Sequence, residues 1–200
     1  MGIAIALAVA LGLQAASIVA GDASTVDSIP VTLSEKLVRY EVKGDTSHEL
    51  VDDMKKVGPL DEKSAKRYQG LTVWAARWTF DTARQADGRC GLEHVKVELE
   101  VLMTLPEWHP KRHADPRLEQ AWPGYLASLT GHEMGHRANG VKAAFAVRDA
   151  LAAMASMEDC QALTTAADSS ANAAFGSYMG ADVEYDRETN HGATQIMQLP

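Results

Sequence analysis

The sequence has few cysteines and too little positive charge to balance its acidic residues. Its 200 residues include only 2 cysteines, and 19 lysines and arginines stand against 27 aspartates and glutamates, for a net charge of -8. A composition of 46% hydrophobic and 23% charged residues excludes a disulfide-scaffold, collagen-like or wholly disordered chain. The acidic balance argues against nucleic-acid binding and against attachment to an anionic membrane surface, because both need a basic face. We therefore expect an ordinary globular domain with no nucleic-acid partner.

Charged side chains are absent from residues 1–20. An apolar run from Ile3 to Leu13 is followed by small residues, a pattern typical of a secretory signal peptide. We expect residues 1–20 to be such a signal, which would make the protein secreted or periplasmic. The alternatives are an uncleaved membrane anchor, with the domain outside the cytoplasm, and a buried N-terminal helix. No cysteine follows the apolar run, which excludes a bacterial lipoprotein.

The two cysteines, Cys90 and Cys160, are consistent with export. An even number of cysteines beside an export signal suggests one disulfide bond. The alternative is a pair of buried free thiols.

Periodicity divides the rest of the chain into two halves. After a linker expected at residues 21–29, the alternation of apolar and polar residues predicts strands over residues 36–42, 70–81 and 92–103. A capping box at Thr46 and Glu49 begins a short helix that ends before Gly58. The first half is therefore expected to form a small, mostly antiparallel sheet with one short helix.

The second half is expected to be helical. Apolar residues at steps of three and four predict a helix from Gly124 to about Met157, and a second helix from Cys160 to about Met179. Residues 106–124 contain four prolines and are expected to be mostly loop or broken helix, and the last twenty residues are expected to be irregular. The predicted fold class is α+β, with a single domain over residues 30–200.

The chemistry is concentrated in residues 132–136, which contain the motif H-E-x-x-H. On a helix, residues i and i+4 lie one above the other, so the imidazoles of His132 and His136 can reach one ion. Zinc accepts neutral imidazole, and catalytic zinc sites have three protein ligands and one open position. Glu133 stands beside the pair and could act as the general base, since bound zinc lowers the pKa of its water to about 7. The motif predicts one Zn²⁺ per chain.

The third ligand must come from another part of the chain. The metzincin extension of the motif is excluded, because Asn139 and Lys142 stand where it needs glycine and histidine. Several acidic residues and one histidine remain as candidates: Glu158, Glu184, Asp159, Asp168, Asp186 and His191.

A second motif, Y-D-x-x-T-x-H-G, occupies residues 185–192. Together with H-E-x-x-H, the tryptophans and Cys160, it resembles a bacterial family of unknown function whose members are described as predicted secreted zinc-dependent proteases. The resemblance extends from about residue 36 to residue 195. It implies that His191 is the third zinc ligand, and it supports a Cys90–Cys160 bridge. It implies no particular substrate.

Two other residues of the second motif have candidate roles. Tyr185 could donate a hydrogen bond to the oxyanion that forms when water attacks a carbonyl, or it could pack its ring on the core. Asp186 could orient a ligand imidazole, or it could be a turn or cap residue.

The motifs together predict a secreted or periplasmic zinc metallopeptidase with a zincin-like H-E-x-x-H helix. The expected partner is a peptide or protein substrate. By analogy with zincins, an edge strand could pair with an extended peptide. The alternatives are a zinc-dependent amidase acting on a cell-wall substrate, and a non-catalytic exported zinc-binding or interaction module. A closed structural site with a fourth protein ligand would favour the last of these.

Overall fold

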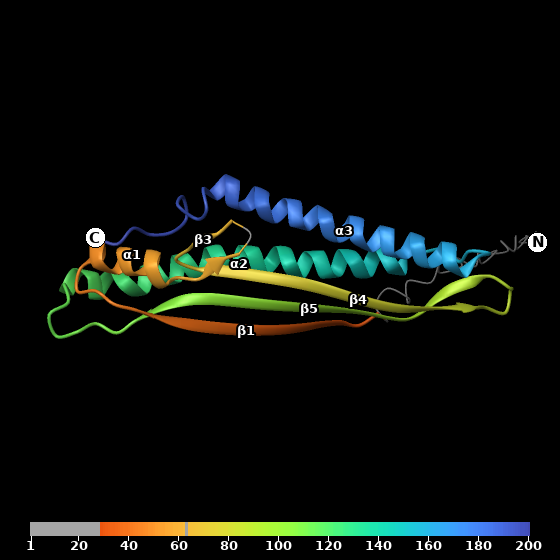
Figure 1. The fold of residues 1–200 in the computed structure, drawn as a ribbon, viewed down its shortest axis with the longest axis horizontal. Coiled ribbons are helices and arrows are strands. Elements are labelled where there is room, and N and C mark those ends of the chain that lie inside the picture. Colours follow the sequence, from red (N-terminus) through yellow and green to blue (C-terminus); the bar gives the residue numbers. More distant parts are fainter. Residues whose placement is uncertain (1–28, 63) are drawn as a thin grey trace, which may run out of the picture.

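The computed structural model describes residues 29–62 and 64–200 and has the expected α+β fold (Figure 1). The signal peptide or anchor expected at residues 1–20, and nearly all of the linker expected at 21–29, lie outside the described residues. The elements in chain order are β1 (Val31–Val42), α1 (Ser47–Val57), β2 (Leu60–Asp61), β3 (Lys66–Arg67), β4 (Leu71–Arg84), β5 (Cys90–Trp108), α2 (Pro116–Ala152) and α3 (Cys160–Thr189).

The main sheet has three strands in the order β1-β5-β4. The central strand β5 pairs in parallel with β1 and antiparallel with β4. Along β5 the side chains of Val97, Leu99 and Val101 are buried, whereas Glu98 and Glu100 are exposed. This confirms the strand with one wet face that the alternating sequence predicts.

The two long helices lie beside the sheet and run along its length (Figure 1). α2 contacts both β4 and β5, and α3 packs mainly against α2. Two buried clusters of apolar residues hold these layers together, one around α1 and the start of α2, the other around the second half of α2 and α3. Trp74 and Trp78 pack against the second cluster, with ring centroids 5.6 and 6.0 Å from that of Phe175. The H-E-x-x-H residues lie on α2 between the two clusters.

The expectation of a mostly irregular segment over residues 106–124 is wrong. β5 continues to Trp108, and α2 begins at Pro116. Proline is well tolerated at the first helical position, and the Asp115 side chain caps this helix by accepting from the backbone N–H of Arg117. Pro123 lies inside α2, directly after the buried residue Trp122, and the helix continues past it to Ala152.

The expectation of an irregular C-terminal tail is also wrong in its first half. α3 continues ten residues past the predicted end and stops at Thr189, where Asn190 adopts the left-handed conformation with φ 50°. The additional turns bring Asp182, Tyr185 and Asp186 to the helix face that meets α2, because residues three and four apart lie on one side of a helix.

The disulfide between Cys90 and Cys160 is present, as expected. It joins the first residue of β5 to the first residue of α3. The Cys90 side of the bond is fully buried. None of the helices in residues 29–62 and 64–200 is long and apolar enough to cross a bilayer.

Candidate metal centre

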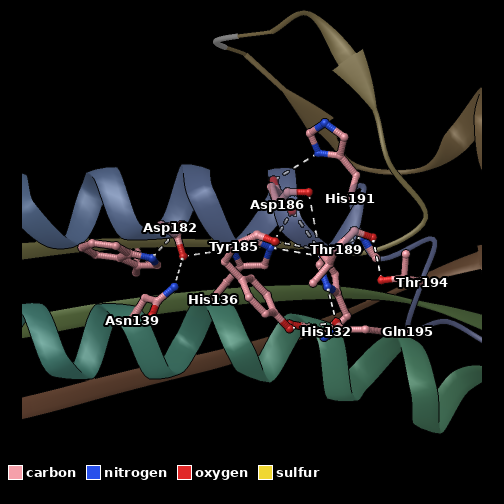
Figure 2. Close-up of polar contacts among 12 residues, drawn as sticks. His132, His136, Asn139, Asp182, Tyr185, Asp186, Thr189, His191, Thr194 and Gln195 are labelled. Carbon is pink, nitrogen blue, oxygen red and sulfur yellow. Dashed lines mark hydrogen bonds and ion pairs between the residues drawn. The ribbon is translucent and has the colours of Figure 1, made fainter.

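The site begins with the three residues of α2 that the motif predicts. His132, Glu133 and His136 are buried, with exposed fractions of 5%, 3% and 9%. The helical spacing places the Nε2 atoms of the two histidines 3.3 Å apart (Figure 2). The two imidazoles therefore present their nitrogens to one point in space.

Asp186 of α3 supplies the third group at this point. Its Oδ1 atom lies 3.4 Å from Nε2 of His132 and 3.2 Å from Nε2 of His136. The ligand atoms of these three residues all lie within 4.8 Å of one another, so they could hold a metal ion. Two imidazoles and one carboxylate are a donor set that zinc accepts in catalytic sites.

Hydrogen bonds at the other ring nitrogens orient both histidines. Nδ1 of His132 lies 3.0 Å from Oε1 of Gln195, and Nδ1 of His136 lies 3.0 Å from Oδ1 of Asp182. Because both partners are acceptors, each Nδ1 carries a proton, and each Nε2 is the atom left to bind an ion. This arrangement fits a metal site, since ligand histidines in proteins usually donate their second N–H to such a partner.

Asp182 connects three elements behind His136. Besides the histidine, it accepts a hydrogen bond from the Asn139 side chain at 2.9 Å and one from the Trp74 indole at 3.3 Å. Burial by itself would lower the pKa of His136, but its hydrogen bonds to Asp182 and Asp186 outweigh burial and raise this pKa to about 10. Without an ion, His136 is therefore protonated at neutral pH, and a bound cation would displace this proton and take up the interaction with the carboxylates.

Asp186 remains ionised in this environment. Burial opposes the charge, but the hydrogen bonds and positive charge of the histidines hold the pKa of Asp186 well below its usual range. The carboxylate is therefore available as an anionic ligand at any pH near neutrality.

Glu133 is a buried carboxyl of the motif that lies beside the Thr72 side chain of β4. Its Oε2 atom is buried and has no hydrogen-bond partner among the described residues. Burial raises the pKa of the Glu133 carboxyl, as expected for a group removed from water. Gly70 allows the close approach of β4 here, because a Cβ at that position would lie 2.7 Å from Oε1 of Glu133. An acceptor held beside the metal-binding group in this way can take up a proton.

A cavity of about 550 Å³ opens onto Glu133, His132, His136 and Asp186. Residues 70–74, at the start of β4, form one wall, and residues 191, 193 and 196–199, which follow α3, form another. β4 is an edge strand of the main sheet. The cavity is therefore bounded by a strand edge on one side and by the H-E-x-x-H motif on the other.

His191 lies outside the metal-binding group. Its Nδ1 is 3.2 Å from Oδ2 of Asp186, its side chain is 55% exposed, and its ring lies 5.9 Å from that of Tyr68. Asp186 thus stands between His191 and the two motif histidines (Figure 2). The role of His191 as a zinc ligand stays a prediction. Asp186, which was considered for orienting a ligand imidazole, is itself the third member of the metal-binding group.

Tyr185 is placed beside His132. Its ring stacks on the imidazole, with centroids 5.1 Å apart, and its hydroxyl lies 2.9 Å from Oε1 of Gln195 and 3.2 Å from the backbone oxygen of His132. The hydroxyl therefore contacts the backbone of His132 and the Gln195 side chain that orients this histidine. A hydrogen bond from Tyr185 to an oxyanion stays a prediction. Glu158, Glu184, Asp159 and Asp168 are not members of the metal-binding group in the part of the chain that the structure describes.

Sequence reasoning missed three residues of the site, namely Asn139, Asp182 and Gln195. Asp182 precedes Asp186 by four residues, a spacing that would have placed both on one helix face had α3 been predicted to continue. Gln195 carries no signal in the sequence, because its role depends on where the chain turns after α3.

Residues 37–192 match a family described as a bacterial protein of unknown function (DUF922). The match covers more than half of the chain, which therefore belongs to this family. A search of the curated proteins found no match, and a search of the solved structures found none either.

Proposed function

We propose that this family member is an exported zinc-dependent metallopeptidase that hydrolyses peptide bonds with Glu133 as general base. One observation carries the proposal: Glu133 is a buried carboxyl whose Oε2 atom has no hydrogen-bond partner in the part of the chain that the structure describes, held beside a group of metal-binding atoms and facing a cavity. A purely structural metal site needs no such group, because its four ligands close the coordination shell. The Glu133 carboxyl therefore supports a catalytic metal site over a purely structural one.

His132, His136 and Asp186 would hold the ion. Zinc bound there would supply a Lewis acid that polarises a carbonyl group and makes water nucleophilic near neutral pH. Glu133 accepts the proton of the attacking water at its free Oε2 atom and then delivers it to the leaving amine. Its raised pKa suits both transfers, since a carboxyl that ionises closer to neutral pH takes up and releases a proton more readily.

The walls of the cavity support an extended peptide as substrate. An edge strand presents unpaired backbone groups that can bind another strand, and β4 presents its edge next to Glu133. The cavity also has several apolar side chains in its lining, among them Leu71, Val73, Met179 and Ile196. We infer that the preferred peptides carry a bulky apolar residue near the cleaved bond.

The disulfide supports export. Disulfides form and persist in oxidising compartments, and the bridge between Cys90 and Cys160 fits an extracellular or periplasmic location. The signal peptide at residues 1–20 remains part of the proposal.

The test is cleavage of an unbiased peptide library by the protein lacking residues 1–20, with zinc supplied. It is run beside Glu133→Ala and beside a matched control, Glu119→Ala, which removes an exposed glutamate from the same helix. We expect cleavage by the wild type and by Glu119→Ala, and a loss of at least about 100-fold in Glu133→Ala with zinc still bound.

Equal cleavage by Glu133→Ala would remove this residue from the mechanism. Failure of all three proteins to cleave any peptide would overturn the peptidase proposal and lead to a screen of cell-wall amides, the substrates of the amidase alternative.

A further inference from the structure

The chain after α3 turns back onto the metal centre. Asn190, His191 and Gly192 have φ values of 50°, 51° and 81°, so three successive residues adopt the left-handed region and reverse the chain direction. The segment then runs back to α2, where the N–H of Met197 donates to the Ser128 hydroxyl at 2.8 Å. Residues 190–200 are called the C-terminal segment below.

One side chain of this segment reaches into the site. Oε1 of Gln195 lies 3.0 Å from Nδ1 of His132 and 2.9 Å from the Tyr185 hydroxyl (Figure 2). An amide oxygen has two lone pairs, so it can accept both hydrogen bonds at once. The acceptor at Nδ1 determines that the imidazole proton stays there and that Nε2 faces His136 and Asp186.

We propose that Gln195 is a positioning residue for His132, and that the C-terminal segment is thereby a working part of the metal centre. The proposal rests on metal binding by His132, His136 and Asp186, and it does not depend on what reaction follows. Gln195 stands three residues beyond the family match, which ends at residue 192. The site is therefore completed by a part of the chain that the family match does not include.

The two histidines are oriented by different chemistry. Asp182 behind His136 is a carboxylate carried by the rigid helix α3, whereas Gln195 behind His132 is a neutral amide carried by a turn. A carboxylate acceptor makes the imidazole more basic than an amide does. His132 is therefore held by the weaker acceptor, and its orientation depends on the docking of the C-terminal segment.

Two glycines allow the close packing that this arrangement requires. A Cβ at Gly192 would lie 3.0 Å from Cδ2 of His132, at a backbone conformation that favours glycine. A Cβ at Gly135 would lie 2.3 Å from Cζ of Tyr185, whose ring stacks on His132. The imidazole of His132 is thus enclosed by the tyrosine on one face and by the start of the C-terminal segment at its edge.

The experiment compares three variants with the wild type, using purified protein with the disulfide intact. Gln195→Met keeps the length of the side chain and removes the acceptor, Gln195→Glu keeps an acceptor, and Gln161→Met makes the same change at an exposed position of α3. Three quantities are measured: the zinc Kd by competition with a chelator, the absorption spectrum of the Co²⁺ form, and the thermal unfolding of the metal-free protein. None involves a substrate, so failure of this proposal is distinguishable from failure of the peptidase proposal.

For Gln195→Met we expect a zinc Kd about 10- to 100-fold weaker and a changed Co²⁺ spectrum, because the imidazole is no longer held in one orientation. For Gln195→Glu we expect a Kd equal to or tighter than that of the wild type, and for Gln161→Met no change.

A Kd for Gln195→Met within twofold of the wild type, with the same Co²⁺ spectrum, would overturn the proposal. So would equal weakening by Gln195→Met and Gln195→Glu, since an acceptor at this position would then not matter. If Gln195→Met does not fold, Gln195→Glu decides: retained affinity supports the assignment, and lost affinity refutes it.

Discussion

Removal of the disulfide should separate the stability of the fold from the geometry of the metal centre. The bond joins residues 70 positions apart, and closing a loop of that length stabilises the folded state by about 4 kcal/mol in the chain-entropy model. For a chain of this size, that loss lowers Tm by roughly 8–16 °C. The perturbation is the double variant Cys90→Ala with Cys160→Ala, because Cys90 is fully buried and alanine introduces no polar group.

Removal of the disulfide should leave zinc binding at the metal centre unchanged. Cys160 is the first residue of α3 and Asp186 lies 26 positions further along the same helix, a separation of about 39 Å at 1.5 Å per residue. The packing of α3 against α2 lies between the two ends and remains in place below the unfolding transition. We therefore expect the zinc Kd of the double variant at 20–25 °C, well below its Tm, to stay within about twofold of the wild type.

The assay is thermal unfolding followed by circular dichroism with zinc chelated, combined with zinc titration of the same samples. Wild type treated with a reductant is the matched comparison, because it lacks the bond but keeps both side chains. An unchanged Tm in both samples would refute the entropic reasoning. A zinc Kd that weakens as much as stability falls would refute the separation of the disulfide from the site.

Three further predictions concern the packing beside the site, the placement of Glu133 and the pH dependence of zinc binding. Gly140→Ala should lower stability by about 1–3 kcal/mol, because the new Cβ would lie 2.8 Å from Cγ of Trp74; urea unfolding measures it. Gly70→Ala should reduce peptide cleavage without weakening zinc binding, since the added Cβ displaces Glu133 and leaves the ligands in place. Because the pKa of His136 is raised to about 10 and that of His132 is raised as well, zinc binding at pH 7 should release protons, and the Kd should weaken at least about tenfold for each pH unit below neutrality.

Each of these has a contradicting result. Gly176→Ala is the control for the first, because a Cβ there meets nothing within 4 Å; equal effects of the two alanines would exclude the clash as the cause. Loss of zinc binding in the Gly70→Ala variant would show that β4 supports the ligands as well as the base. Calorimetry in buffers of different ionisation enthalpy that detects no proton release would contradict the raised pKa of His136. The same raised pKa predicts that the metal-free protein loses stability as pH rises from about 6.5 to about 10, since the protonated imidazole is favoured in the folded state.

The strands and the first helix were predictable because their signals are local. Alternation along residues 92–103 placed the buried and exposed faces of β5 correctly, and the capping box at Thr46 and Glu49 placed the start of α1. Proline misled the prediction between β5 and α2, because a proline at the first helical position begins a helix as readily as one elsewhere ends it. The helix α3 was predicted to end too early, at about Met179, because the polar residues that follow lack an apolar stripe; they lie on the helix face that meets the metal-binding group.

The sequence by itself determined the half of the site that lies on one helix. The spacing of His132 and His136 follows from helical geometry, with Glu133 beside them, and a chain with two cysteines has only one disulfide to form. The third member of the metal-binding group, Asp186, and the partners that orient both histidines were decided by tertiary structure alone. Asp182 is 46 residues from His136, and Gln195 is 63 residues from His132. Contacts over such separations depend on how α3 packs along α2 and where the chain turns after it, and no local pattern encodes either.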